Sequence, residues 1–445
     1  MSDALSIFVL DLLQGLDRQE IAHVVARRAD LLPHPPAGDD VDLVLPRRDL
    51  SRAAVLVRDL ADRHDGLIFA AAGEPGSYQF RLSFRGDEGP DLLHLHLQDS
   101  MSHRGVELVS ASDMLKGRQL AGGFWQPAPA MRGVALLLHD LVAKSGFRER
   151  DAREIVALYN DDPAAFEQAL QRSAGTAAAR KIAAALAQGD PAAALALRGP
   201  IVRRGFLRRP AAAMRWKVSH VLRNLGFALR RRGALVVLMG PDGSGKTSLV
   251  EEIRKTLVAG GCKAERVYFG LTTPLLPTKR LLRGLRDRRR SSADAKDQQV
   301  PREPGFRSNL SYFLGTTHAL LDQYARYIVH ARPKLAQARI LLCDRYFFDA
   351  LTSPAPGWLK PAMDWTAVRL TPRPDLVFVL EDDAEAIHAR KPELTVWEIE
   401  RQQSCFDRLT RRPISAVQVR IDPDPLPNAR EMSWQILAAY AKRHA

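Results

Sequence analysis

The order of apolar and polar positions gives the last third of the chain a regular rhythm. Short uninterrupted apolar runs alternate with stretches in which apolar residues recur every three or four positions. Such runs are typical of strands buried on both faces, and the second spacing is typical of amphipathic helices. The alternation predicts an α/β domain with a five-stranded parallel sheet over residues 232–445. The expected strands are Ala234–Met239, Ile340–Cys343 and Leu376–Leu380, with weaker ones at Arg266–Phe269 and Val417–Ile421.

The first 125 residues carry shorter apolar runs mixed with two helical patterns. This mixture predicts a small α+β domain over residues 1–125. One helix is expected over residues 3–28 and another over Arg52–Arg63. The expected strands are Val41–Leu45, Leu67–Ala71, Tyr78–Phe84 and Leu92–Leu97.

The segment between these regions, residues 126–231, is alanine-rich and predicts a helical connector. Its last part, 201–232, holds ten basic residues and no acidic one, interleaved with apolar positions. This composition fits a basic amphipathic helix lying on an anionic membrane surface. It also fits a linker helix packed on a neighbouring domain with its charges in solvent, which is the interpretation we favour. A further basic stretch, Lys279–Arg290, predicts a mobile solvated insertion.

Composition narrows the classes of protein. Among 445 residues, 46% are apolar and 26% are charged, which excludes a wholly disordered chain. The net charge of +14 suits anionic partners such as nucleotides or an acidic lipid surface. Nucleic acid is disfavoured as a partner, because no patch interleaves aromatic with basic residues.

The cysteine positions and the lengths of the apolar stretches indicate the cellular compartment of the protein. The cysteines Cys262, Cys343 and Cys405 are scattered, which disfavours structural zinc and a disulfide scaffold. No apolar stretch approaches the ~18 residues of a membrane span, and the first residues lack a signal-peptide pattern. We therefore expect a cytoplasmic protein, with segment 201–232 allowing contact with the inner face of the membrane.

The strongest chemical motif is a glycine-rich loop that fits G-x-x-x-x-G-K-[ST] between an expected strand and an expected helix. Its glycines let backbone N–H groups turn inward on a phosphate. Lys246 can reach the β- and γ-phosphates of ATP, and the Thr247 hydroxyl is an expected Mg²⁺ ligand. The expected ATP-binding residues are Gly240, Pro241, Asp242, Gly243, Ser244, Gly245, Lys246, Thr247 and Ser248.

A second candidate group, Asp344-Arg345, directly follows the expected strand Ile340–Cys343. The carboxyl ends of parallel strands are where α/β proteins place site residues. An acid at this position can hold Mg²⁺, and the planar guanidinium beside it can bind a second phosphate. An ordinary surface ion pair is the alternative.

Three segments together resemble the thymidylate kinase-like branch of the P-loop nucleoside monophosphate kinases: GPDGSGKTS, CDRYFFD and RPDLVFVLEDDAEAIHARK. The likeness covers residues 232–445. It implies that the loop binds ATP, that Asp344 helps to hold Mg²⁺ and that Arg345 contacts the phosphate of the acceptor. A basic lid would then be supplied by Arg390 and Lys391, with Arg401 one helix later. The expected catalytic residues are Lys246, Asp344, Arg345 and Arg390.

Two departures from that family leave the acceptor open. Where the family usually has a serine three residues after its D-R-Y motif, this chain has Asp349, and LTSPAPGW replaces the run that helps to form the base pocket. The family's Arg-Glu-Pro-Gly-Gly-Thr stretch has a partial counterpart in Arg302–Gly305. We therefore expect phosphoryl transfer to a nucleoside monophosphate or a similar phosphorylated small molecule.

The N-terminal region resembles polymerase-β-like nucleotidyltransferases through Asp40-Val-Asp42 on an expected strand. Two carboxylates two residues apart on a strand point to the same face and could share Mg²⁺. The third acid of that family would fall on the strand Leu-His94-Leu-His96-Leu, where histidines stand instead. We expect a degenerate nucleotidyltransferase-like domain that transfers no nucleotide. The histidines are expected to form the polar face of the strand, with metal ligation as the alternative.

The order of the two domains is similar to that of bacterial proteins often associated with surface polysaccharide synthesis. The alternative to an enzyme is an ATP-binding regulatory or scaffold module at a membrane-associated complex, docked through segment 201–232. Whether two copies of the chain pair as a homodimer is left open.

Overall fold

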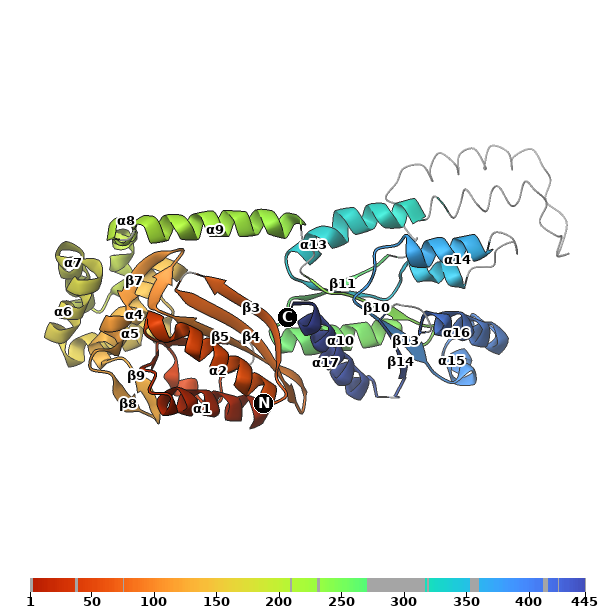
Figure 1. Ribbon diagram of the computed structural model, residues 1–445, viewed down its shortest axis with the longest axis horizontal. Helices are drawn as coiled ribbons and strands as arrows, with labels where there is room; N and C mark the ends of the chain where they lie inside the picture. Colours follow the sequence, from red (N-terminus) through yellow and green to blue (C-terminus); the bar gives the residue numbers. More distant parts are fainter. Residues whose placement is uncertain are drawn as a thin grey trace. The chain divides into compact units, whose positions relative to one another are not determined.

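Figure 1 shows the computed structural model of the protein. The chain forms two compact units, residues 1–226 with 441–445 and residues 227–440. The first unit takes in the expected α+β domain and most of the expected connector. The expected insertion at Lys279–Arg290 and the Arg302–Gly305 stretch lie outside the described residues. The structure describes residues 3–36, 39–74, 76–208, 210–229, 233–269, 317, 320–352, 360–410, 415–422 and 424–444.

The first unit is built on a five-stranded mixed sheet in the order β1-β2-β5-β4-β3. Neighbours β2 and β5 run parallel, and the other neighbouring pairs are antiparallel. Helices α1 (Asp3–Arg18) and α2 (Leu50–Arg63) pack on the sheet and share its apolar core (Figure 1). The strands are β1 (Val24–Val25), β2 (Asp40–Val44), β3 (Leu67–Glu74), β4 (Ser77–Gly86) and β5 (Gly89–Gln98).

The helix expected over residues 3–28 is wrong in its second half, because α1 ends at Arg18. Glu20 has φ +56°, a left-handed conformation that commonly ends helices, and the Ile21 amide donates to the Leu16 carbonyl at 2.9 Å. The apolar residues that continue the helical spacing belong instead to β1, which pairs with the end of β2. Pairing with a distant strand has overridden the local pattern.

The rest of the first unit is mostly helical, as expected for the connector. Helices α4 to α7 surround a second apolar core, and two short hairpins, β6-β7 and β8-β9, complete the unit. The elements are β6 (Ser100–His103), β7 (Val106–Ser110), α3 (Ala111–Leu115), β8 (Gln119–Ala121), β9 (Phe124–Gln126), α4 (Pro129–His139), α5 (Glu149–Asp161), α6 (Pro163–Ala174), α7 (Thr176–Ala187), α8 (Arg198–Arg208) and α9 (Pro210–Leu229).

Helix α9 has one face against its own unit. Gly105 allows this close approach, since a Cβ there would lie 2.5 Å from the Trp216 Cβ. On another side of the helix, Met214, Val218 and Val221 are 50% to 55% exposed. None of the helices in the described part of the chain is both long and apolar enough to cross a bilayer.

The second unit contains the five-stranded parallel sheet that the sequence predicts, in the order β11-β12-β10-β13-β14. The central strands are buried on both faces, with α13, α14 and α16 sharing one core with them. The strands are β10 (Leu235–Met239), β11 (Ala264–Val267), β12 (Ile340–Cys343), β13 (Leu376–Glu381) and β14 (Ala416–Arg420). The helices are α10 (Lys246–Ala259), α13 (Arg332–Ala336), α14 (Lys360–Arg369), α15 (Ala384–Arg390), α16 (Val396–Thr410) and α17 (Pro425–His444).

The strand order changes direction at β10. After β10 the chain passes through α10 to β11 and returns to β12 beside β10, and β13 then pairs on the other side of β10. In open parallel sheets, ligands bind outside the carboxyl ends of the strands at such a reversal. The loop that follows β10 lies at this reversal and is therefore positioned to bind a ligand.

Candidate functional site

Glycines shape the loop between β10 and α10. Gly243 and Gly245 have φ values of +93° and +75°, which side chains rarely adopt. A Cβ on Gly243 would also lie 3.0 Å from the Cβ of Lys391, which follows α15. Helix α10 begins at Lys246, so its first backbone N–H groups lie at the loop. A loop of this shape at a helix N-terminus is suited to bind an anion.

Lys246 is buried over this loop. Its Nζ donates to the Gly240 carbonyl at 2.7 Å and to the Pro241 carbonyl at 2.5 Å. Burial lowers the pKa of Lys246 to about 8, although the Asp242 carboxylate, 3.6 Å away, acts in the opposite direction. The ammonium is thus held mainly by neutral carbonyl oxygens, which a charged phosphate oxygen would outcompete.

The two expected metal ligands, Thr247 and Asp344, lie together. Asp344 follows β12, and its Oδ2 accepts hydrogen bonds from the Thr247 hydroxyl at 3.1 Å and from the Arg266 guanidinium. Its Oδ1 is buried and has no hydrogen-bond partner among the described residues. Hydroxyl and carboxylate oxygens are ligands that Mg²⁺ accepts, usually alongside water and phosphate. In the described part of the chain, no group of three or more His, Cys, Asp or Glu is placed to hold a metal ion.

Arg266 is a site residue that the sequence alone does not identify. It lies on β11, in register with Leu342 of β12, and its guanidinium forms an ion pair with Asp344. The sequence contains one signal, a basic residue at the start of an expected strand. That signal becomes informative only once β11 is known to lie next to β12, which the apolar pattern does not show.

Arg345 lies across the loop, between two carboxylates. Its guanidinium forms an ion pair with Asp242, and Asp349 is 3.7 Å away. Burial raises the pKa of Asp349 to about 6, although Arg345 and Lys246 act against the increase. Burial also acts to raise the pKa of Asp242, but Arg345 and Lys246 outweigh it and hold that pKa below its usual value. Cationic and anionic side chains therefore alternate around this loop.

Of the expected lid cations, the structure brings one to the loop. The Cβ of Lys391 lies close to Gly243, and the charge of the Lys391 side chain contributes to the lowered pKa of Asp242. Arg390 is ion-paired with Asp382, which follows β13. Arg401 lies over the Trp397 ring of its own helix, 5.7 Å from the centroid.

The expected acidic pair of the first unit is engaged by basic side chains. Strands β2 and β5 are in register, so Asp40 lies beside His94 and Asp42 beside His96, with imidazole-to-carboxylate distances of 3.2 and 3.3 Å. Asp42 is 5% exposed and also forms an ion pair with Arg27. Burial by itself would raise the pKa of Asp42, but His96 and Arg27 hold it well below its usual value. The histidines thus partner the carboxylates, and Arg27 contacts an oxygen that a shared metal ion would need.

Comparison of the chain with protein-family models and with curated protein sequences finds no match. The geometry and chemistry of these residues are therefore the basis for assigning a function.

Proposed function

We propose that the second unit transfers the terminal phosphoryl group of ATP to a phosphorylated small molecule, such as a nucleoside monophosphate, with Mg²⁺ as cofactor. The observation that carries this proposal is the position of Thr247 and Asp344. Their oxygens meet at 3.1 Å, at the carboxyl end of β12 and the N-terminus of α10, beside a glycine loop that holds Lys246. This combination suits a triphosphate and its metal ion.

Each group has a distinct task in the proposed reaction. The loop amides and Lys246 would bind the phosphates of ATP, and Thr247 and Asp344 would hold Mg²⁺, which supplies charge neutralisation when bound. The acceptor phosphate oxygen forms a bond to the γ-phosphorus while the bond to the β-phosphate oxygen breaks and ADP leaves. Phosphoryl transfer depends mostly on positioning and on electrostatic stabilisation. The site accordingly needs no strong general base.

Arg345 is the proposed contact for the acceptor phosphate. Its present partners, Asp242 and Asp349, are carboxylates that an acceptor phosphate would have to displace. Asp349 replaces the serine expected from the resemblance, so it places a negative charge where an anionic acceptor is expected to bind. The acceptor is therefore proposed only as a class of phosphorylated molecules, with a role in surface polysaccharide synthesis as one context.

ATP consumption across a panel of nucleoside monophosphates and sugar phosphates tests this proposal. We expect one acceptor to stimulate turnover in the presence of Mg²⁺, and chelation of the metal to abolish that stimulation. The matched control for Lys246→Ala is Lys255→Ala on the same helix, where the ammonium is exposed and pairs with Glu252 at 2.8 Å. Acceptor-stimulated turnover that survives Lys246→Ala would contradict the assignment.

A second candidate function, an ATP-binding module docked at an anionic membrane, has one observation in its favour. The exposed side chains Met214, Val218 and Val221 recur at helical spacing on α9. Arg215 and Lys217 lie beside them in the sequence, and the helix contains no acidic residue. An apolar stripe bordered by cations is suited to the surface of an anionic bilayer.

Vesicle binding distinguishes this second function from the first. For a membrane module we expect ATP binding without turnover, together with salt-sensitive binding to vesicles that contain phosphatidylserine. The charge variant Val218→Asp should abolish that binding, and Val55→Asp, at an equally exposed valine of α2, should leave it intact. Steady acceptor-stimulated turnover of ATP without vesicle binding would argue against the membrane module and support the phosphotransferase function.

A further inference from the structure

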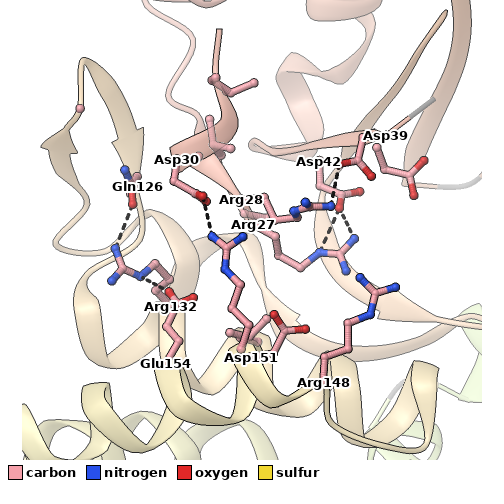
Figure 2. A pocket seen from close by; sticks show the side chains of 18 of the residues that line it. Arg27, Arg28, Asp30, Asp39, Asp42, Gln126, Arg132, Arg148, Asp151 and Glu154 are labelled. Atoms are coloured by element: carbon pink, nitrogen blue, oxygen red, sulfur yellow. Dashed lines mark hydrogen bonds and ion pairs between the residues drawn. The ribbon is translucent and has the colours of Figure 1, made fainter. Parts of the chain in front are cut away.

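The first unit contains a cavity of about 740 Å³ that includes Arg27, Asp40 and Asp42 and is separate from the glycine loop of the second unit. Its walls come from the segment after β1, from the start of β2, and from α4, α5 and the turn between them. Figure 2 shows the charged side chains that line it, with basic and acidic groups facing one another. The volume lies within the range of small-molecule binding sites, so a ligand the size of a nucleotide could enter.

Most of the charges in this cavity are already paired with one another. Arg28 contacts Asp39 at 2.6 Å, and Arg132 lies 3.5 Å from Glu154 (Figure 2). Arg148 differs, because it forms no ion pair with any residue that the structure describes. It directly precedes α5 and points toward the guanidinium of Arg27 (Figure 2). Two guanidinium groups directed at one another favour an anion between them, although the cavity as a whole is lined by equal numbers of basic and acidic side chains.

The backbone at Arg28 is a second, independent feature of this cavity. Arg28 has φ +56° and ψ +36°, a left-handed conformation that residues other than glycine rarely adopt. Glu20, after α1, has a similar positive φ, so at Arg28 this conformation by itself indicates a turn of the backbone. The Arg28–Asp39 pair is partly exposed, and such pairs contribute little to stability, so Arg28 can exchange Asp39 for a ligand at small cost.

Two carboxylates that line the cavity, Asp40 and Asp42, already contact basic side chains. Asp42 is bound by Arg27 and His96, and Asp40 by His94. In nucleotidyltransferases, metal ions held by carboxylates contact the phosphates of the nucleotide, whereas here Arg27 competes with a metal ion for Asp42. An anion held directly by guanidinium groups needs no metal, and the planar guanidinium fork matches a phosphate group.

We propose that this cavity is a metal-independent binding site for a phosphorylated small molecule, whose phosphate lies between Arg27, Arg28 and Arg148. The site is separate from the glycine loop of the second unit, and its existence does not depend on the proposed phosphotransferase activity. It gives the first unit a ligand-binding role in place of nucleotidyl transfer.

Calorimetric titration of the full chain with pyrophosphate, a nucleoside diphosphate and a sugar phosphate tests the proposal. The titrations are run with EDTA and with the Lys246→Ala chain, so that the glycine loop contributes little to the measured binding of the probes. We expect at least one of these probes to bind, and Arg148→Gln to weaken that binding about 10- to 100-fold, as loss of a charged contact to phosphate does. Arg148→Lys should restore part of the affinity.

Arg153→Gln is the matched control. Arg153 lies on α5, is mostly exposed, does not line the cavity and pairs with Glu149 on its own helix. We expect this variant to bind the probes as the Lys246→Ala parent does. Absence of millimolar or tighter binding for all three probes would overturn the proposal. Equal affinities in the Arg148→Gln and Arg153→Gln chains, or binding that appears only when Mg²⁺ replaces EDTA, would also overturn it.

Discussion

Asp42→Asn tests whether the buried carboxylate of the first unit is a structural ion-pair partner or a ligand kept for a metal ion. The substitution keeps the shape of the side chain and removes its charge. Asp42 is 5% exposed, and the side chain of its partner Arg27 is 20% exposed. Removing one partner of a buried pair costs about 3–5 kcal/mol, because the other charge is left uncompensated. Arg27 retains some access to water, so we expect a loss of about 3 kcal/mol at pH 7.

The sign of the pH dependence follows from the lowered pKa of Asp42. A carboxyl whose pKa is lower in the folded state stabilises the fold fully above its unfolded pKa of ~4. That contribution is lost as the pH falls through the folded value. The stability difference between the wild-type chain and Asp42→Asn should therefore be constant from about pH 7 to pH 5 and should narrow below about pH 4.

Urea unfolding combined with hydrogen exchange of the β2 and β5 amides measures this difference within the first unit. Asp39→Asn is the matched control, because Asp39 is also next to β2 but its pair with Arg28 is partly exposed. We expect the control to change stability by less than about 1 kcal/mol. An Asp42→Asn chain as stable as wild type, or more stable, would refute the reasoning. Such a result would indicate that the buried carboxylate destabilises the fold and has a ligand-binding role instead of a structural one.

Three further outcomes are expected. Lys246→Ala should reduce phosphoryl transfer at least ~100-fold in steady-state assays without lowering the melting temperature, and Lys255→Ala should change neither. Arg345→Ala should weaken equilibrium binding of the acceptor by about 10- to 100-fold and leave ATP binding intact; the opposite pattern would reverse the role given to Arg345. The full chain should transfer no labelled nucleotide from an NTP with Mg²⁺ or Mn²⁺. Transfer that disappears in the double variant Asp40→Ala, Asp42→Ala would show that the carboxylates do hold metal ions.

The parts of the second unit that the sequence predicted well are those that depend on local pattern. A strand buried on both faces must be apolar throughout, so the runs that became β10, β12 and β13 could be recognised from their residues alone. The loop at 240–247 was equally visible, because its glycines and Lys246 stand together in the sequence. Its placement at the reversal of strand order could be seen only from the structure.

The features that escaped prediction depend on contacts between distant residues. Arg27 and Asp42 are close in sequence, but their pairing requires the chain to turn back after α1, which the helical spacing through residue 28 concealed. Arg266 reaches Asp344 only because β11 lies next to β12. The cavity in the first unit is formed by α4 and α5 together with the segment after β1, over 100 residues earlier in the chain. No periodicity within one segment carries that information.

The register of β2 with β5 limits where residues can be inserted into or deleted from these two strands. Alternate residues of these strands, including Val41 and Leu95, enter the apolar core under α1 and α2, while the residues between them form the row of carboxylates and imidazoles. Insertion of a single residue within β5 would exchange the two rows, since strand side chains alternate between faces. Two imidazoles would then enter the apolar core, and leucines would take their place beside Asp40 and Asp42. Natural variants of this chain should therefore gain or lose residues at the turns that flank β5, and keep the spacing within the strand unchanged.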